Sequence, residues 1–258
     1  DIDKRVKGKS YKILSKKKIK VKKGLLKNEV KNFYQSYIIN RTQKIPFVTS
    51  KLAVSSNNLI YSKINRKITD NVSDKLTHYL RFKNDAILIS YKTLNIDNPK
   101  LNCRLKGYEK FSPTRVILDR DLKIRFDSYI CKTAKKIKTI IFYNTLNLKK
   151  MKLLRKKGLK FVKLNLDDKG YFNLKNVLKK LFLLGIRNLL VEGGDKITKN
   201  FLKNRLMNEF YLFKSPKKLS KNHEFQTFTS LGILNSKYNK KFKSSIKLAK
   251  DNISIYIR

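Results

Sequence analysis

The fold class is decided by residues 188–195, whose sequence is NLLVEGGD. Asn188–Glu192 is a short apolar run typical of a buried strand, and a helical pattern begins at Asp195 directly after Gly193 and Gly194. Glycines at the end of a strand let the backbone approach a ligand, and the free N–H groups of the following helix attract a phosphate. The same residues also suit an ordinary strand-to-helix turn, and they do not form the GxGxxG dinucleotide fingerprint.

The alternation of strand and helix extends on both sides of this stretch, from Ile45 towards the C-terminus. Apolar runs predict strands at 47–54, 85–90, 115–119, 139–143, 161–164, 188–192, 209–213 and 253–257, and helices at 70–83, 147–157, 174–184 and from 195. Asn173 is a suitable N-cap for the third helix, and Gly185 is a suitable stop. This pattern predicts an α/β fold with a mainly parallel sheet, helices on both faces, and the last strands as an antiparallel edge.

Residues 1–43 follow a different pattern. Ile19–Val21 is a short strand candidate, and residues 25–41 have apolar side chains at helical spacing. Neither stretch is long enough to bury a core of its own. We therefore divide the chain into a segment 1–43 and a domain 44–258.

The net charge of +45 is the most extreme feature of the composition. Such a charge suits nucleic-acid binding through phosphate contacts. However, 51 of the 63 basic residues are lysines, and they are scattered along the chain rather than gathered in one motif. We interpret this excess as the drift of an AT-rich genome, in a protein that binds no specific nucleic acid.

Other composition features exclude several classes of protein. No apolar run reaches the roughly 18–20 residues of a membrane span, and the N-terminus lacks the apolar region of a signal peptide. Two cysteines, Cys103 and Cys131, and two histidines, His78 and His223, form no zinc motif at a standard spacing. The sequence predicts a cytoplasmic protein with reduced thiols, no membrane contact and no metal.

Three further features are weak when taken singly. Residues 93–104 follow a predicted strand and contain the turn signal Asp97-Asn98-Pro99, which is able to direct Asp97 and Arg104 into a crevice or simply to form a surface turn. Lys51 interrupts an apolar strand and must reach a partner, a cavity or solvent. Arg81 stands late in its predicted helix, where a solvated side chain is the default.

Together these signals resemble the reductase part of the bacterial bifunctional riboflavin-biosynthesis deaminase–reductase family. The family pattern R-P-[FY]-V-T-x-K-x-A-x-S-x-D-G is similar to residues 45–58, and its later blocks are similar to Ile68-Thr69, Arg81, residues 85–88, Thr93, residues 97–99, Leu101, Arg104, residues 115–119, residues 191–194 and residues 215–219. Residues 1–43 resemble the end of the family's deaminase domain, and residues 44–258 its reductase domain.

This resemblance implies a dihydrofolate-reductase-like fold. It also implies NADPH-dependent reduction of 5-amino-6-(5-phosphoribosylamino)uracil, with hydride transfer to C1′ of the ribosyl group. By the family's pattern, NADPH contacts Ala53, Thr93, Asp97, Gly194, Asp195, Lys196 and Ile197. The phosphorylated pyrimidine substrate contacts Lys51, Asn65, Arg81, Leu101, Arg104 and Glu192. We add Arg120 for the adenosine 2′-phosphate, because its forked donors suit that group, and Lys51 as the catalytic proton donor, with water as the alternative.

Departures from the family pattern leave alternatives open. The family's S-x-D-G is Ser55–Asn58 here, and the loop 57–67 is altered. A reductase of the same fold acting on another substrate is therefore one alternative, and a basic nucleic-acid-binding protein is another. The family's zinc motifs have no counterpart, and the first residue is not Met, so we expect a piece of a longer reading frame without deaminase activity or zinc. The family also suggests a homodimer.

Overall fold

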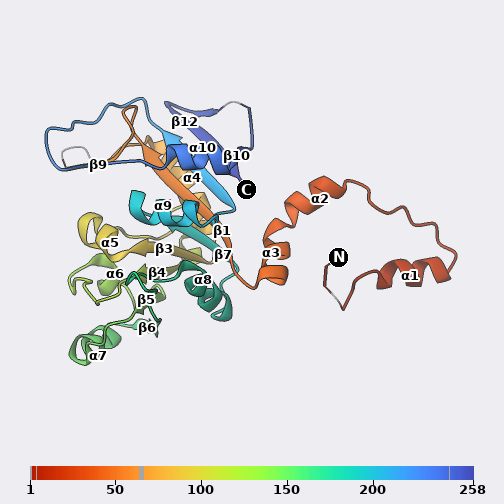
Figure 1. Cartoon of the computed structure of the whole chain (residues 1–258), viewed down its shortest axis with the longest axis horizontal. Helices are drawn as coiled ribbons and strands as arrows, with labels where there is room; N and C mark the ends of the chain where they lie inside the picture. Colours follow the sequence, from red (N-terminus) through yellow and green to blue (C-terminus); the bar gives the residue numbers. More distant parts are fainter. Residues whose placement is uncertain (1, 4, 64–66, 244) are drawn as a thin grey trace.

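The computed structural model describes residues 2–3, 5–63, 67–243 and 245–258 and is built around one ten-stranded sheet (Figure 1). Its strands are β1 (Phe47–Val54), β3 (Ala86–Ser90), β4 (Thr114–Leu118), β5 (Thr139–Tyr143), β6 (Leu159–Lys163), β7 (Asn188–Glu192), β8 (Glu209–Lys214), β10 (Asn239–Lys240), β11 (Ile246–Leu248) and β12 (Asp251–Ile257). Their order is β10-β12-β8-β1-β7-β3-β4-β5-β6, with β11 beside β12. The predicted α/β class is confirmed.

The centre of the sheet is parallel. β1 pairs in parallel with both β7 and β8, and β3, β4, β5 and β6 continue in the same direction from β7. β12 runs antiparallel to β8, as predicted for the sheet's edge. The same prediction for β8 is wrong. The helix between β7 and β8 returns the chain to the end of the sheet where β7 began, so β8 runs parallel to β1.

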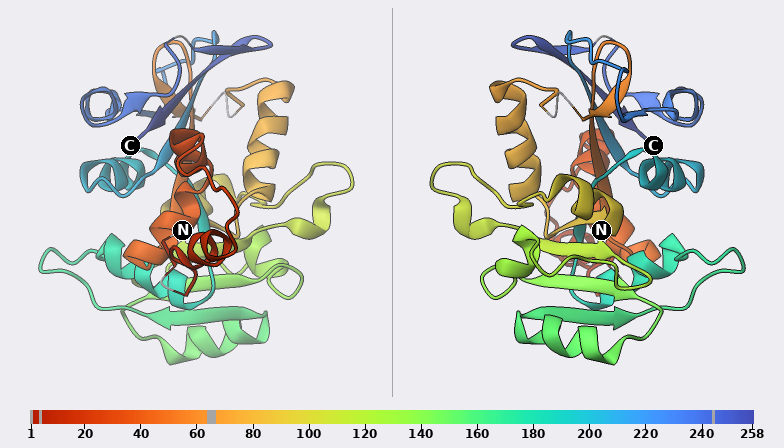
Figure 2. Two further views of the ribbon diagram at one scale, coloured as in Figure 1. Left: turned by 90° about the vertical axis from the view of Figure 1, so that its right-hand side faces the viewer. Right: turned by 90° about the vertical axis from the view of Figure 1, so that its left-hand side faces the viewer.

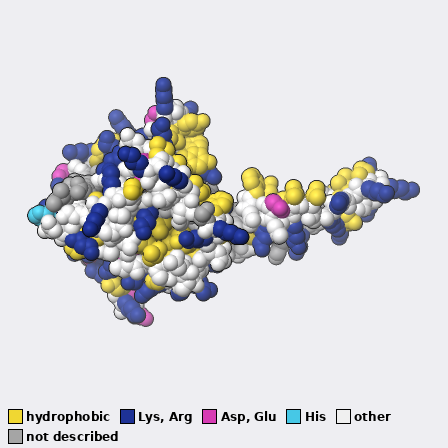
Figure 3. Space-filling model, turned by 90° about the horizontal axis from the view of Figure 1, so that it is seen from above, with side chains coloured by type: hydrophobic (Ala, Val, Ile, Leu, Met, Phe, Trp, Pro, Cys, Tyr) yellow, Lys and Arg dark blue, Asp and Glu magenta, His cyan; other side chains and the backbone are white. Residues whose placement is uncertain are grey.

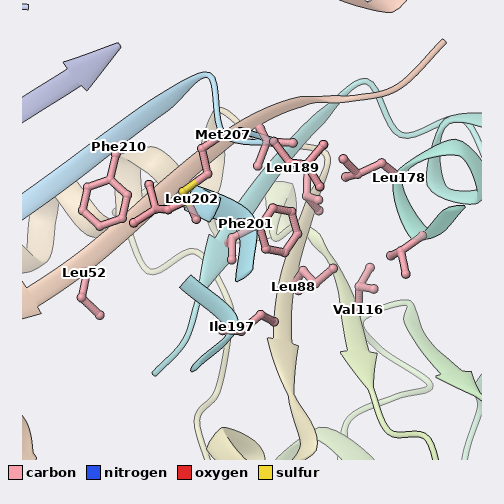
Figure 4. Packing of buried hydrophobic residues seen from close by; sticks show 14 of the residues in the cluster. Leu52, Leu88, Val116, Leu178, Leu189, Ile197, Phe201, Leu202, Met207 and Phe210 are labelled. Atoms are coloured by element: carbon pink, nitrogen blue, oxygen red, sulfur yellow. The ribbon is translucent and has the colours of Figure 1, made fainter. Parts of the chain in front are cut away.

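Helices cover both faces of the sheet, as predicted (Figure 2). The helices are α1 (Lys9–Lys16), α2 (Lys27–Phe33), α3 (Gln35–Gln43), α4 (Asn71–Phe82), α5 (Tyr91–Asp97), α6 (Tyr129–Lys132), α7 (Leu148–Lys156), α8 (Leu174–Leu183), α9 (Asp195–Lys203) and α10 (Leu231–Lys237). Buried side chains of α8, α9 and α10 share one core, and those of α4, α5, α6 and α7 share the other. In the first core, Phe201 of α9 lies against Leu88 and Leu189 of the sheet (Figure 4).

Capping residues explain where several helices begin. Asn173 accepts hydrogen bonds from the backbone N–H groups of Lys175 and Asn176, and Gly185 follows α8 with φ 90°, so both predictions for this helix are confirmed. Asp70 caps α4 in the same way by accepting from the N–H of Ser73.

Some short elements were not predicted. The segment after β3 begins with the helix α5, which Ser90 caps, before the turn at Asn98. A separate two-stranded sheet joins β2 (Leu59–Ser62) to β9 (Phe225–Thr227), and a 3-10 turn spans Glu109–Phe111. These elements are too short for apolar periodicity to reveal them.

The N-terminal segment extends away from the body as an arm (Figure 1). Neither α1 nor α2 has a buried residue, and the helical pattern at 25–41 divides at Tyr34 into α2 and α3. The strand prediction for Ile19–Val21 is wrong, since this stretch pairs with no strand in the described part of the chain. Hydrophobic side chains follow one side of the arm and basic side chains the other (Figure 3). Within the described residues, no helix has both the length and the apolar character needed to cross a membrane.

A test of the β7–α9 connection follows from Gly193. A Cβ atom there would lie 2.6 Å from Cγ2 of the buried Ile197, whose branched side chain has little rotamer freedom in a helix. We expect Gly193→Ala to lower the free energy of unfolding by about 1–3 kcal/mol through overpacking, measured by urea denaturation. Gly232→Ala is the matched control, because a Cβ there meets nothing within 4 Å. Equal stability of the two variants would contradict this packing constraint.

Candidate active site

A cleft of about 1050 Å³ opens at the carboxyl ends of β1, β3, β4 and β7. This is the place where open α/β sheets bind ligands. Eleven of the predicted site residues line it: Lys51, Ala53, Thr93, Asp97, Leu101, Arg120, Glu192, Gly194, Asp195, Lys196 and Ile197. The chain thus brings together residues that are as much as 146 positions apart in sequence (Lys51 to Ile197).

The N-terminus of α9 forms one wall of the cleft. The N–H groups of Asp195, Lys196 and Ile197 precede the first intrahelical hydrogen bond, which Thr198 donates to the carbonyl of Gly194. Such an end attracts anions. Gly194 has φ −70°, so a left-handed backbone is not the reason for glycine here; a Cβ atom would instead lie 3.3 Å from Oε1 of Gln226.

The carboxylate of Asp195 is already engaged. It accepts hydrogen bonds from the N–H and Oγ1 of Thr229, at 2.9 and 2.6 Å, and from Oγ of Ser230 at 3.0 Å. The side chain therefore fixes the 229–230 loop beside the helix. Any ligand contact of Asp195 is expected from its backbone N–H group.

At the β7 end of the cleft, the carboxylate of Glu192 forms an ion pair with Arg81. Nε of Arg81 donates to Oε1 of Glu192 at 2.9 Å, and Nη2 donates to Oε2 at 2.7 Å. The side chains are only 11% and 15% exposed. Burial alone raises the pKa of Glu192, but the guanidinium of Arg81 outweighs it and holds that pKa below the ordinary value.

Lys51 is the neighbour of Glu192 in the β1–β7 register and also lines the cleft. Its Nζ lies 4.9 Å from the ring centre of Phe213, and none of the described carboxylates lies within 4.0 Å of it. Burial lowers the pKa of Lys51, and the charge of Glu192 only partly opposes that shift. The result is an ammonium group that releases its proton more readily than a surface lysine.

The predicted phosphate residues lie beside the cleft rather than on its wall. Arg81 and Arg104 are not among the lining residues, although Leu101, with φ 47°, is. Nη1 of Arg104 donates to Oδ1 of Asn102 at 3.0 Å, and its side chain is only partly covered by the protein. Burial and the nearby charge of Arg81 lower the pKa of Arg104, which marks a locally cationic site.

Basic side chains gather at the other end of the cleft. Nη1 of Arg120 donates to the carbonyl of Gly170 at 2.8 Å, while its Nε and Nη2 bond Asp121. Lys92, Lys169 and Lys196 line the same cleft, and Nζ of Lys196 lies 5.1 Å from the ring centre of Tyr171. This end suits an anionic ligand with a flat aromatic group.

Two polar residues of this region were not predicted from the sequence, and one predicted residue is not described by the structure. Asp74 lines the cleft and pairs with Lys67 at 3.1 Å, and His78 is buried beside Arg81 and Arg104. Asp74, His78 and Arg81 follow one another at spacings of four and three residues on one predicted helix, and this spacing was the available signal. Asn65, predicted to contact substrate, lies outside the described residues. Within the described residues, no cluster of three or more His, Cys, Asp or Glu side chains is arranged to hold a metal ion.

Known proteins that are similar to this chain are consistent with one family. Residues 46–254 match the model of the RibD C-terminal domain. The riboflavin biosynthesis protein RibD of Aquifex aeolicus is 32% identical over 212 residues, which are 81% of this chain and 57% of that protein. The 2,5-diamino-6-ribosylamino-4(3H)-pyrimidinone 5′-phosphate reductase of Debaryomyces hansenii is 32% identical over 185 residues, which are 66% of this chain and 74% of that protein.

A solved structure extends the likeness to the arm. The diaminohydroxyphosphoribosylaminopyrimidine deaminase/5-amino-6-(5-phosphoribosylamino)uracil reductase of Thermotoga maritima matches with a TM-score of 0.74 and 25% identity, over 97% of this chain and 67% of that one. Coverage of 97% leaves too few residues unmatched for the whole of segment 1–43 to lie outside the match. The chain spans little more than half of the Aquifex relative, at 57% of its length.

The burial of His78 predicts a pH-dependent stability. Burial and the charges of Arg81 and Arg104 lower the pKa of His78 from 6.5 to about 4. Because the unfolded chain binds the proton more readily, the stabilisation is complete above pH 6.5 and is lost as the pH falls through about 4. Between these values the wild type should lose on the order of 2–3 kcal/mol more than His78→Gln, measured by urea denaturation at several pH values. His223→Gln, at an exposed site, is the control and should follow the wild type. Parallel curves for the wild type and His78→Gln would refute the expectation.

Proposed function

We propose, from the premise that this chain belongs to the RibD C-terminal domain family, that it is the NADPH-dependent reductase of riboflavin biosynthesis. Its substrate is 5-amino-6-(5-phosphoribosylamino)uracil, and its product carries a ribityl group in place of the ribosyl group. The names of the Debaryomyces and Thermotoga relatives support this reaction. The main observation in its favour is that the free N–H groups of α9, Lys51 and Glu192 all line one cleft.

The residues present fit a nicotinamide dinucleotide. The N-terminus of α9 and the close packing at Gly194 suit a pyrophosphate, while Ala53, Thr93 and Asp97 line the cleft between that helix and α5. When bound, the cofactor supplies a hydride. We assign NADPH rather than NADH because Arg120, Lys169 and Lys196 offer cations for a 2′-phosphate.

The proton that accompanies the hydride is assigned to Lys51. Reduction of a ribosyl to a ribityl group adds one hydride and one proton, so an acid must serve the site. Nζ of Lys51 carries a proton whose pKa burial lowers, and it lies next to Glu192 in the strand register. Glu192 is assigned to bind the hydroxyl groups of the substrate's ribose. Its carboxylate, although held by Arg81, has lone pairs left that can accept hydrogen bonds from these hydroxyl groups.

The substrate phosphate is assigned to Arg104 and the turn at Leu101. Leu101 lines the cleft, and Arg104 is a cation without a carboxylate within 4.0 Å among the described residues. A guanidinium binds phosphate through paired N–H donors. The expectation that Arg81 also binds this phosphate stays a prediction, as does the role of Asn65.

We assign segment 1–43 to the end of a deaminase-type domain and residues 44–258 to the reductase domain. The match to the Thermotoga deaminase/reductase, which reaches into this segment, supports the division. So do the exposed apolar side chains of the arm, among them Leu25, Leu26 and Phe33. We expect neither deaminase activity nor bound zinc from this chain, and the homodimer remains a prediction.

Arg104 tests the substrate assignment. We expect the wild type to oxidise NADPH only when the pyrimidine phosphate is present, followed by absorbance at 340 nm. Arg104→Ala should raise the KM for that substrate about 10- to 100-fold, which is the worth of a charge-assisted hydrogen bond. Lys106→Ala, on the same exposed loop, should leave the KM unchanged. An unaltered KM in Arg104→Ala would remove Arg104 from the phosphate site.

Arg120 tests the choice of cofactor. Arg120→Ser should raise the KM for NADPH about 10- to 100-fold, because it removes a charge-assisted contact with the 2′-phosphate, and should leave the KM for NADH unchanged. The control is Arg125→Ser. Like Arg120, Arg125 is exposed and forms an ion pair with a nearby aspartate, which in this case is Asp127. Equal losses with both cofactors would assign Arg120 to folding of the 167–171 loop instead.

A further inference from the structure

Lys67 and Asp74 form an ion pair on the wall of the cleft. Nζ of Lys67 lies 3.1 Å from Oδ2 of Asp74, and both residues line the cleft. Their side chains are 56% and 43% exposed, so a ligand in the cleft can reach both charges. A pair this exposed contributes little to the stability of the fold, but it remains available for binding.

Neighbouring side chains hold the pair without using all of its hydrogen-bonding capacity. Nζ of Lys67 also donates to Oδ1 of Asn71 at 2.6 Å, and Oγ1 of Thr69 donates to Oδ1 of Asp74 at 3.4 Å. An ammonium group has three N–H donors, and a carboxylate has about four acceptor sites. Among the residues that the structure describes, one donor of Lys67 and further acceptor sites of Asp74 are therefore left over. The cleft thus contains a free donor directly beside a free acceptor.

The pair lies at the opposite end of α4 from the predicted phosphate residues. Asp74 belongs to the first turn of α4 and Arg81 to its last turn, and their seven-residue separation corresponds to about 10 Å along the helix axis. The backbone N–H of Arg104 donates to Nδ1 of His78, which fixes the turn that carries Arg104 beside the later part of the helix. One side of the cleft therefore has cations near one end of α4 and the ion pair near the other.

Lys51 is within electrostatic reach of both ends of α4. Burial lowers the pKa of Lys51; among the nearby charges, Glu192 and Asp74 oppose that shift, and Arg81 adds to it. The residues assigned to the reacting sugar therefore lie close to the ion pair as well as to the predicted phosphate site.

The proposed substrate fits this order of groups. Its phosphate is attached at C5′ of the ribose and its pyrimidine, through an amino group, at C1′. With the phosphate near Arg104 and the ribose near Lys51 and Glu192, the pyrimidine is directed towards the start of α4. A uracil ring presents an N–H donor next to a carbonyl acceptor, a pattern complementary to a carboxylate beside an ammonium group.

We propose that Asp74 and Lys67 bind the uracil ring of the substrate. Asp74 accepts a hydrogen bond from a ring N–H, and Lys67 donates one to the adjacent carbonyl oxygen. Both hydrogen bonds are charge-assisted and therefore stronger than those between neutral groups. The inference rests on the proposed function, which supplies the substrate, and it adds the residues that recognise the base.

Ribose 5-phosphate separates recognition of the base from recognition of the rest of the substrate, because it has the sugar and the phosphate but no base. Asp74→Ala and Lys67→Met should each raise the KM for the pyrimidine phosphate about 10- to 100-fold, as expected when a hydrogen bond to a charged group is lost. Neither should change the Kd of ribose 5-phosphate, measured by calorimetry. Asp74→Asn keeps a side-chain oxygen and should recover part of the loss. Equal losses for both ligands would mean that the pair only holds the start of α4, and would overturn the proposal.

Two other kinetic results would also contradict this role. A lower kcat in Asp74→Ala with an unchanged KM would mean that Asp74 acts through the charge of Lys51. A raised KM for NADPH, with an unchanged KM for the pyrimidine phosphate, would assign the pair to the cofactor instead.

Matched controls exclude effects of charge and folding. Lys75→Met removes an exposed lysine of α4, and Asp127→Ala removes the aspartate of another exposed ion pair, so both should match the wild type with every ligand. Circular dichroism melts should place all variants close to the wild type, because exposed pairs add little stability. If Asp74→Ala does not fold, Lys67→Met and Asp74→Asn provide the same comparison.

Binding measurements distinguish failure of this inference from failure of the proposed function. If the wild type binds the pyrimidine phosphate without oxidising NADPH, the proposed function fails. A Kd for that compound that rises in Asp74→Ala and Lys67→Met, with an unchanged Kd for ribose 5-phosphate, still supports recognition of the base. If the wild type turns over and both variants retain its KM, recognition by this pair alone is refuted. A wild type that does not bind the pyrimidine phosphate refutes both.

Discussion

The buried ion pair between Arg81 and Glu192 is the constraint on which the rest of the site depends. It joins α4 to the carboxyl end of β7 through two residues that are 111 positions apart in sequence. A buried pair contributes little net stability, because desolvation offsets its attraction, but removing one partner leaves an uncompensated charge. The pair therefore fixes geometry more than it stabilises the fold. Lys51, the neighbour of Glu192 in the β1–β7 register, has no carboxylate within 4.0 Å of its Nζ among the residues that the structure describes.

The charge of the whole chain and the charge of the cleft have different meanings. The +45 charge is spread over the body and the arm, without one gathered patch on the face in Figure 3. Salt screens the interactions between such scattered, exposed charges over a distance of about 10 Å. Within the cleft, by contrast, the backbone N–H groups of α9 and the side chains of Arg120, Lys169 and Lys196 face one space. That local arrangement, and not the total charge of the chain, is the feature that suits an anionic ligand.

Sequence reasoning succeeded where burial imposes a pattern. β1, β5 and β7 are apolar runs buried by neighbouring strands, and their bounds match the prediction because continuous apolar residues suit a strand covered on both faces. The location of the cleft at Gly193 and Gly194 was also predicted, although the reason for both glycines is close packing against Ile197 and Gln226 rather than backbone conformation. The partners of Arg81 and Asp195 were not predicted, since pairs more than 30 residues apart leave no mark in local periodicity.

The arm shows the same limit of prediction from local sequence, because a strand predicted there does not form. Ile19 and Val21 alternate with lysines as an edge strand would, yet they form no ladder with the described residues. Strand propensity expresses how well a side chain packs against neighbours, so it yields no strand where no neighbour is present. The same holds for α1 and α2, which have no buried residue. A sequence pattern therefore specifies which face requires a partner, and only tertiary contact turns that requirement into structure. The sheet supplies this contact in residues 44–258 and to α3, which is bonded to Arg187 and Asn188, but not to α1 and α2.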